Sequence, residues 1–198
     1  FFPRLYDIES GSIQINGTDI SDMTQYNLRE LMGFVPQKAV LFSGTIRDNM
    51  QYGKPDATDE MIWKALEIAQ AKDFVSEMED GLDSHVEQGG GNFSGGQRQR
   101  LAIARALVKT AEIHVFDDSF SALDFKTDAN LRQALKTNMK ESITVLVAQR
   151  VSTVMDADMI LVLDEGKLVG KGTHEELLAT NETYQEIVHS QLREEDLA

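Results

Sequence analysis

The chain has 198 residues, 41% of them hydrophobic and 26% charged, so it is long enough to bury a core as one globular domain. Its formal net charge of -14 at pH 7 argues against a broad nucleic-acid or anionic-membrane surface, because such surfaces need an excess of Lys and Arg. The sequence has no cysteine, which excludes disulfides and thiolate sites, and no apolar run near the roughly 20 residues of a membrane helix.

The first elements predict a small antiparallel sheet. Residues 11–17, GSIQING, alternate apolar and polar side chains and stop at Asn16 and Gly17, which predicts a strand entering a tight hairpin turn. LMGFVPQ then predicts a short strand that Pro36 ends, with Gln37 in the polar loop after it. The N-terminal FFPRLYD has no signal-peptide pattern and no initial Met, so we interpret it as a start inside a longer protein.

The middle of the chain is predicted to be helical. Apolar residues recur at helical spacing over 58–71, with Thr58 as the predicted cap. The stretch 88–97, QGGGNFSGGQ, then predicts a glycine-rich loop that leads into the N-terminus of a strong helix.

Strands and helices alternate in the rest of the chain, which predicts an α/β fold with a mainly parallel sheet. Thr173 and Glu176 form a capping-box pattern at the start of one of the helices. The predicted strands cover 113–117, 143–148, 159–164 and 167–170, and the predicted helices cover 126–139, 174–179 and 183–192.

Two adjacent carboxylates, Asp117 and Asp118, follow the strand-like run IHVF. An aspartate at the end of an apolar strand is where phosphate-handling α/β proteins hold Mg²⁺, because the carboxyl end of the strand opens into the nucleotide crevice. A capped strand end explains Asp117 alone equally well. The second acid favours the metal hypothesis, since neighbouring buried carboxylates repel each other unless a cation or a proton separates them.

A second candidate phosphate site is Ser94-Gly95-Gly96, which places a hydroxyl and unhindered backbone N–H groups at a helix start. On these three residues alone, a flexible turn capped by Ser94 is the favoured alternative. The nearby cluster of Arg98, Arg100 and Arg105 fits ion pairs within the domain as well as contacts with a nucleotide.

Together these motifs resemble the nucleotide-binding domain of an ATP-binding cassette (ABC) transporter. FSGGQ, HVFDD, SALD and AQR occur in this order with VPQ upstream, and LFSGTIRDNMQYG and SGSIQINGTDI resemble the exporter branch. The resemblance implies a P-loop NTPase-like ABC ATPase fold with a mainly parallel core sheet, a small antiparallel β part and a helical subdomain. We therefore expect 1–198 to be a partial nucleotide-binding domain, with the helical subdomain at about 45–110 and the core sheet and C-terminal helices at 111–198.

The resemblance also implies a role for each matched residue, with ATP and Mg²⁺ as cofactors. The glutamine after VP approaches the metal and senses the membrane domain, and the signature motif FSGGQ contacts the nucleotide bound on a partner domain. The implied nucleotide-binding residues are Gln37, Ser94, Gly95, Gly96, Gln97 and Asp124, the metal residues are Asp117 and Gln37, and the catalytic positions are Asp118 and Gln149.

Two positions depart from the family pattern. Asp118 stands where the catalytic glutamate is usual, and withdrawing a carboxylate by roughly 1 Å can cost on the order of a hundredfold in rate. Gln149 stands at the switch-histidine position and cannot exchange protons usefully. Neutral drift at two loop positions is the alternative. Because both changes fall in one site, the sequence resembles the degenerate-site subunit of a heterodimeric multidrug exporter.

The implied partners are a second ABC nucleotide-binding domain, in a heterodimer, and a transmembrane domain upstream or in the same complex. We expect the chain to lie at the cytoplasmic face of the cell membrane, with no nucleic-acid partner and no direct insertion into the bilayer.

The phosphate loop G-x-x-x-x-G-K-[ST] does not occur in these 198 residues. The resemblance places this loop just before Phe1, so we expect an N-terminally truncated domain that alone binds ATP weakly or not at all. An open alternative is a non-catalytic truncated cassette that only presents its signature to a partner ATPase. A soluble cassette ATPase acting on DNA or ribosomes is disfavoured by the acidic balance and by FSGTIRDN.

Overall fold

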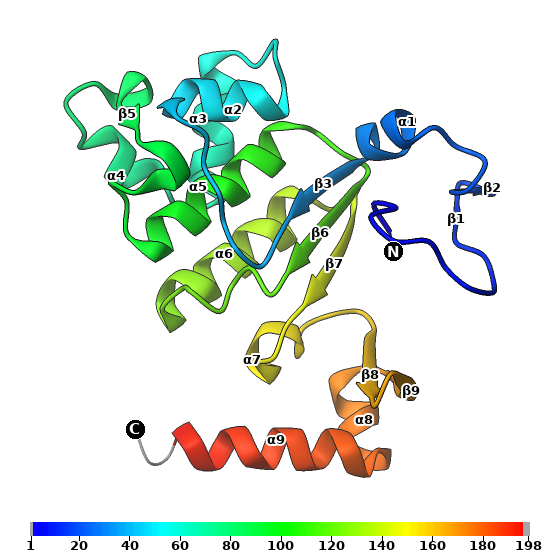
Figure 1. The fold of residues 1–198 in the computed structure, drawn as a ribbon. Coiled ribbons are helices and arrows are strands. Elements are labelled where there is room, and N and C mark those ends of the chain that lie inside the picture. Colours follow the sequence, from blue (N-terminus) through cyan, green and yellow to red (C-terminus); the bar gives the residue numbers. More distant parts are fainter. Residues whose placement is uncertain (1, 196–198) are drawn as a thin grey trace. The chain divides into compact units, whose positions relative to one another are not determined.

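The computed structural model describes residues 2–195, the last four of them by their backbone alone. The chain forms two compact units, Phe1–Val147 and Ala148–Ala198 (Figure 1). Within the described residues, none of the helices has both the length and the apolar character that crossing a membrane requires.

A three-stranded parallel sheet is the centre of the first unit, as the apolar strand pattern predicts (Figure 1). The strand order is β3-β6-β7, and Ile113 of β6 lies opposite Met32 of β3 and Ile143 of β7. β3 and β7 are the two edge strands of this sheet, and Ile143 and Val147 of β7 are 63% and 52% exposed. The strands are β3 (Met32–Val35), β6 (Ile113–Asp117) and β7 (Ile143–Val147).

The predicted hairpin at the start of the chain is confirmed. β1 (Gln14–Ile15) pairs antiparallel with β2 (Thr18–Asp19). Asn16 and Gly17 between them have φ angles of 51° and 78°, the left-handed values that a tight two-residue turn needs. A second antiparallel pair joins β4 (Gly44–Thr45) to β5 (His85–Val86).

The N-terminal part covers one face of the sheet. Leu28 of α1 (Gln25–Glu30) is fully buried there with Met32 and Val115. Thr24 caps α1, because its side chain accepts from the N–H of Asn27 at 3.1 Å. The remaining buried members of this cluster are Ile15, Ile20 and Ile113.

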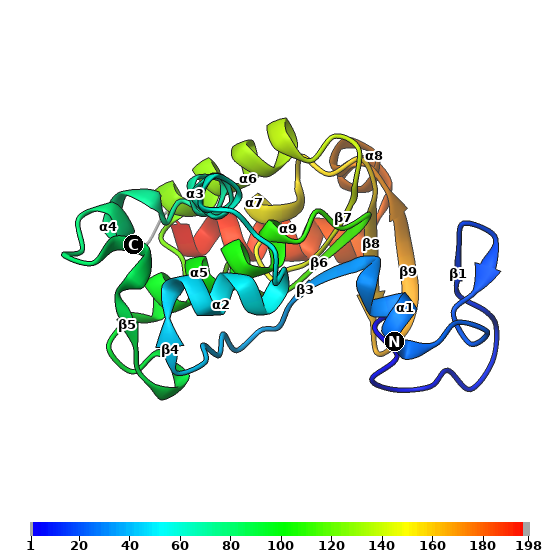
Figure 2. The ribbon, with the colours of Figure 1, turned by 90° about the horizontal axis from the view of Figure 1, so that it is seen from above.

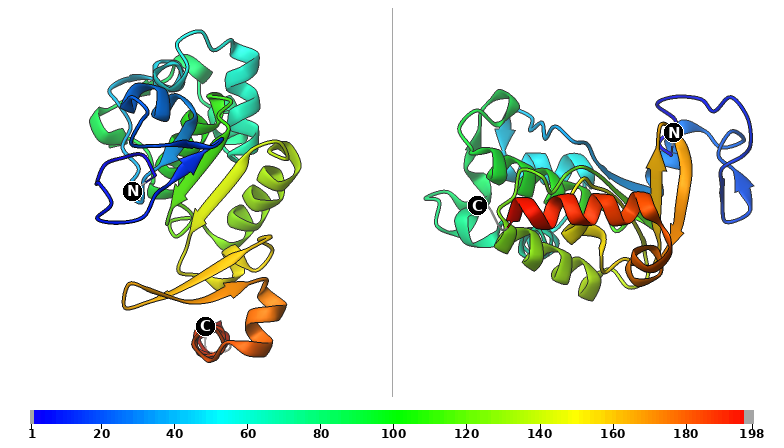
Figure 3. Two further views of the ribbon diagram at one scale, coloured as in Figure 1. Left: turned by 90° about the vertical axis from the view of Figure 1, so that its right-hand side faces the viewer. Right: turned by 90° about the horizontal axis from the view of Figure 1, so that it is seen from below.

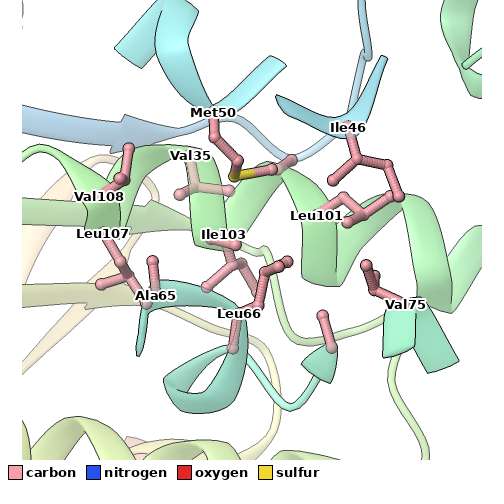
Figure 4. Close-up of a cluster of buried hydrophobic side chains, with 14 of the residues drawn as sticks. Val35, Ile46, Met50, Ala65, Leu66, Val75, Leu101, Ile103, Leu107 and Val108 are labelled. Carbon is pink, nitrogen blue, oxygen red and sulfur yellow. The ribbon is translucent and has the colours of Figure 1, made fainter. Parts of the chain in front are cut away.

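Helices provide the other, larger core of the first unit. Figure 4 shows Leu101 and Ile103 of α5 between Met50 of α2 and Leu66 of α3, so α5 lies in the middle of this core. The helices are α2 (Ile46–Gly53), α3 (Asp59–Ile68), α4 (Lys72–Ser76), α5 (Gly95–Val108) and α6 (Phe125–Asn138), with short 3-10 turns η1 (Gly81–Asp83) and η2 (Gln88–Gly90).

α3 begins as predicted but ends earlier. Thr58 caps it through a 3.4 Å bond from the N–H of Met61, whereas the helix ends at Ile68 rather than continuing to Ala71. Gln70 has a φ of 59°, a left-handed conformation that stops a helix. The apolar spacing extends past this turn, so the pattern alone places the end too late.

Helix α5 approaches its neighbours very closely. A Cβ added to Gly53 of α2 would clash with the carbonyl of Arg105. A Cβ added to Gly33 of β3 would lie 2.7 Å from His114 Cδ2 and 2.9 Å from the carbonyl oxygen of Ala106. Glycine at these two positions therefore sets how closely α5 packs on α2 and on the sheet.

The segment between β3 and β4 runs alongside α2 (Figure 2). Asn49 of α2 is buried, and its side chain forms hydrogen bonds with the backbone of this segment. Its Oδ1 accepts from the N–H of Phe42 at 2.9 Å, and its Nδ2 donates to the carbonyls of Phe42 and Thr45 at 2.8 and 3.0 Å. The loop that begins at Gln37 is thus fixed at its far end.

The second unit is a β hairpin packed on helices (Figure 3). β8 pairs antiparallel with β9 through a turn at Glu165 and Gly166, whose φ angles are 45° and 77°. The predicted capping box is present, because the Thr173 N–H donates to Glu176 Oε2 at 2.9 Å and the Glu176 N–H donates to Thr173 Oγ1 at 3.3 Å. The elements are α7 (Val151–Val154), β8 (Ile160–Asp164), β9 (Lys167–Gly172), α8 (His174–Thr180) and α9 (Glu182–Glu195).

Candidate functional site

The carboxyl ends of β3 and β6 bring two predicted site residues together. These strands are adjacent and parallel, so their carboxyl ends meet at the same edge of the sheet. Gln37 follows β3 and Asp118 follows β6. The Gln37 Nε2 donates a hydrogen bond to Asp118 Oδ2 at 3.0 Å, although the two residues are 81 positions apart in the sequence.

The backbone of Asp118 is fixed on both sides. Its N–H donates to the carbonyl of Val147 at 2.8 Å, and its carbonyl accepts from Ser121 Oγ at 2.8 Å. Its φ of 46° is left-handed, a region that Asp enters more readily than most residues with a Cβ. The local backbone therefore favours Asp at this position independently of any catalytic role.

Ser119 also joins the two strand ends, and sequence reasoning missed it. It is buried, and its Oγ donates to the carbonyl of Val35 at 3.1 Å. The bond links the end of β3 directly to the turn after β6. A serine immediately after two acids is a weak sequence signal, because its partner is distant in the chain.

Asp117, Asp118 and Gln37 fit a magnesium ion chemically. Mg²⁺ prefers oxygen ligands and takes only one or two carboxylates from the protein, with waters and phosphates completing its shell. Among the described residues, no group of three or more His, Cys, Asp or Glu side chains could hold a metal by itself. Two carboxylates and a nearby amide oxygen are the few protein ligands that Mg²⁺ needs, so Asp117 and Gln37 are suitable candidates.

The start of α5 presents the second predicted site. The Ser94 Oγ accepts from the N–H of Gln97 at 3.2 Å, and Gln97 Oε1 accepts from the N–H of Ser94 at 2.9 Å, which forms a capping box. Gly95 is exposed. A Cβ added to Gly95 would have the Arg98 guanidinium as its nearest neighbour, at 4.0 Å. Because the Gln97 N–H already donates to Ser94, the N–H groups of Gly95 and Gly96 are the donors of this first turn that could bind an anion.

The loop that contains Asp124 lies beside the same helix start. A Cβ added to Gly96 would lie 3.5 Å from the carbonyl oxygen of Ala122. Asp124 itself caps α6, because its carboxylate accepts from the Thr127 N–H at 2.9 Å and from Thr127 Oγ1 at 2.7 Å. These two bonds hold the pKa of the Asp124 carboxyl below its usual value.

The three arginines of α5 bind backbone carbonyls inside the first unit. Burial lowers the pKa of Arg100 and of Arg105, which is the direction expected when a cation loses water. Structural contacts, which are hydrogen bonds rather than ion pairs, thus account for this basic cluster. Arg98, Arg100 and Arg105 donate to the carbonyls of Phe93, Gln70 and Val40 at 2.7, 2.6 and 2.8 Å.

Gln149 belongs to the second unit and precedes α7. Its side chain is exposed, and its carbonyl accepts from the Gln191 Nε2 of α9 at 2.7 Å. Gln191 carried no sequence signal of function, since a glutamine on an amphipathic helix is ordinary. The structure thus brings together Gln37, Asp117 and Asp118, and separately the start of α5 and the Asp124 loop.

Comparisons with known proteins identify the family of this chain. The ABC transporter family matches residues 2–121. An uncharacterised ABC transporter ATP-binding protein of Mycobacterium bovis is 48% identical over 191 residues, covering 95% of this chain and 32% of the relative. The ATP-dependent lipid A-core flippase of Desulfotalea psychrophila is 42% identical over 189 residues, covering 96% of this chain and 33% of the flippase.

A solved structure shows the same fold. The chain superposes on a bacterial Atm1-family ABC exporter with ATP bound at a TM-score of 0.92 and 39% identity, covering 96% of this chain and 34% of the exporter chain. The chain thus spans about a third of the length of these relatives.

Proposed function

This chain belongs to the ABC transporter family, and we propose that it is the nucleotide-binding domain of an exporter subunit, which couples ATP binding and hydrolysis to efflux across a membrane. The observation that carries the proposal is the pairing of Gln37 with the Asp117-Asp118 strand end, in one unit with an intact signature at the start of α5. The relatives are about three times as long as this chain, which leaves room for a transmembrane domain. That domain would hold this chain at the cytoplasmic face of the membrane.

ATP and Mg²⁺ are the proposed cofactors. Mg²⁺ would neutralise charge that develops on the phosphates during transfer. Asp117 and Gln37 would supply oxygen ligands, and Asp118 would accept a proton from the attacking water. The N–H groups and hydroxyl of Ser94, Gly95 and Gly96 would bind a nucleotide held by the partner domain, while Gln97 holds the shape of that turn.

We further propose that this subunit contributes the impaired site of an asymmetric heterodimer. Asp118 is short, and its carboxylate is already hydrogen-bonded to Gln37. Gln149 can hydrogen-bond but cannot shuttle a proton. The signature of this chain is intact, so it would support hydrolysis in the partner's site while its own site holds ATP for longer.

Reversing both departures tests the impaired-site proposal. Asp118→Glu combined with Gln149→His, in the intact subunit assembled with its partner, should raise single-turnover hydrolysis at this site by about tenfold or more. The gain is limited by strain, because Glu tolerates the left-handed backbone at position 118 less well than Asp does.

A matched control makes the same two chemical changes elsewhere. The control pair is Asp164→Glu and Gln133→His. Asp164 ends β8, Gln133 is an exposed residue of α6, and neither belongs to the proposed site. An equal rate in the test and control pairs would contradict the impaired-site proposal.

A second candidate, favoured by the departures at Asp118 and Gln149, is a non-catalytic cassette that only presents its signature to a partner ATPase. Calorimetry of Mg-ATP with this chain at about 100 µM tests the weak binding that both candidates assume, and a Kd below about 10 µM would contradict it. Single-turnover hydrolysis by the intact subunit then separates the two, since only the exporter domain hydrolyses ATP in its own site.

A further inference from the structure

The side chain of Gln191 on α9 bridges the backbone on both sides of Arg150. Its Nε2 donates to the carbonyl of Gln149 at 2.7 Å, and its Oε1 accepts from the N–H of Val151 at 2.8 Å. A primary amide carries a donor and an acceptor as a peptide group does, so one side chain pairs with this backbone as a neighbouring strand would. Because both bonds are made by one planar amide, they fix the orientation of this backbone as well as its distance from α9.

The segment needs this support because α7 has no cap of its own. Helix α7 has four residues, and its N-cap residue Arg150 makes no side-chain capping bond. The N–H of Val151 is one of the donors that a helix start leaves without a partner inside the helix. Gln191 supplies the missing acceptor from a position 40 residues later in the chain. The start of α7 is therefore capped from another helix.

Helix α9 is anchored well enough to act as the support. Tyr184 and Val188 are buried against Leu177 of α8 and Ile160 of β8. The Tyr184 hydroxyl hydrogen-bonds to His174 Nδ1 at 2.8 Å. α7 and α9 lie side by side in the second unit (Figures 1 and 2). The Gln191 amide therefore extends from a packed helix to the backbone that leads into α7.

We propose that Gln191 is the positioning residue of Gln149, so that the C-terminal helix sets the conformation of the switch segment. The inference rests on the proposed function, in which position 149 supports the attacking water and the transferred phosphate. Gln191 would touch neither nucleotide nor water and would act only through the backbone of position 149. A shift of roughly 1 Å at a catalytic position can cost on the order of a hundredfold, so a two-bond clamp at this point matters for rate.

A spin label measures the clamp without any catalysis. This chain has no cysteine, so Gln149→Cys gives one labelling point in it, in an intact subunit freed of other cysteines. A nitroxide there should be immobilised with Gln191 present, and Gln191→Ala should shorten its correlation time by about threefold or more. Gln185→Ala is the matched control, because Gln185 is also on α9 and donates to a backbone carbonyl, that of Leu178, at 2.8 Å. It should leave the label unchanged.

Hydrolysis measures the consequence of the clamp. In the Asp118→Glu, Gln149→His background, Gln191→Ala should lower single-turnover hydrolysis by about tenfold, and Gln185→Ala should not lower it. Gln191→Glu keeps an acceptor for the Val151 N–H but loses the donor to the Gln149 carbonyl, so it should lower the rate by less than Gln191→Ala does.

Each result decides one claim. Equal label mobility with and without Gln191 would overturn the clamp. A mobile label with an unchanged rate would overturn the positioning role. If the background substitutions themselves produce no gain in hydrolysis, the proposed function fails, and the label experiment still decides whether Gln191 fixes the loop.

Discussion

Acid should destabilise the first unit through His114, which lies in the middle of β6. Its side chain is 3% exposed, and neither ring nitrogen has a hydrogen-bond partner among the residues that the structure describes. Burial lowers the pKa of His114 from 6.5 to about 4, and the nearby carbonyl of Ala106 offsets only part of that shift. As the pH falls below 6.5, this imidazole therefore becomes protonated in the unfolded chain while it stays largely neutral in the folded protein.

The sign and size of the effect follow from this shift. Since the folded pKa lies below the unfolded one, the unfolded state binds more protons as the pH falls from 6.5 towards 4, and stability is lost across that range. For these two pKa values, one histidine removes about 2 kcal/mol between pH 8 and pH 5. In a chain of this length, that loss lowers the Tm by about 4–8 °C.

Urea unfolding at several pH values, followed by the fluorescence of Trp63, measures the effect. Trp63 is the single tryptophan and packs against the helical core of the first unit, so it reports on that unit. His114→Leu should remove about 2 kcal/mol of the pH dependence, while His85→Leu, at an exposed position, should not change it. If wild type and His114→Leu lose stability in parallel between pH 8 and pH 5, the buried imidazole does not carry the effect.

Three further stability predictions use the same unfolding assay. Gly33→Ala should destabilise by about 2 kcal/mol, because its Cβ would clash with His114 and with a backbone carbonyl. Gly91→Ala should change stability little, because the one close contact of its Cβ is the flexible Glu87 side chain at 3.0 Å, and equal effects of the two substitutions would contradict this packing argument. Asn49→Ala should cost about 2 kcal/mol, because it removes three part-buried hydrogen bonds to the backbone of Phe42 and Thr45, and a loss under about 0.5 kcal/mol would contradict that role. Asp124→Ala should cost about 1 kcal/mol by removing the cap of α6, and Asp124→Asn, which still caps, should cost less.

Local patterns predicted most of the fold, because the forces that set these elements act over a few residues. The strand 113–117 matches β6, and Asn16 and Gly17 form the expected turn. Ser94 caps α5 as its position before two glycines predicts. In each case, side-chain type and spacing decide the backbone conformation almost without help from the rest of the chain.

The details of the candidate site were less predictable, because they depend on contacts between distant residues. The resemblance placed Gln37 and Asp118 in one site, but no pattern predicts that their side chains bond directly. The left-handed backbone at Asp118 is set by its bond to Val147, 29 positions later. The arginines of α5 bind carbonyls whose direction is known only once the loops are folded. Gln191 is the clearest case, since its function arises only from the partner it meets.

The outer edge of β7 has a consequence for the handling of this chain in solution. In the described part of the chain, β6 is the only strand that pairs with β7, and the β7 sequence ITVLV has no charge and no proline. Such an edge is a template on which another molecule can add a strand, and short uncharged β-branched segments are the ones that do so most readily. Strand addition at this edge would join two molecules, so a purified sample should remain monodisperse for longer at lower protein concentration.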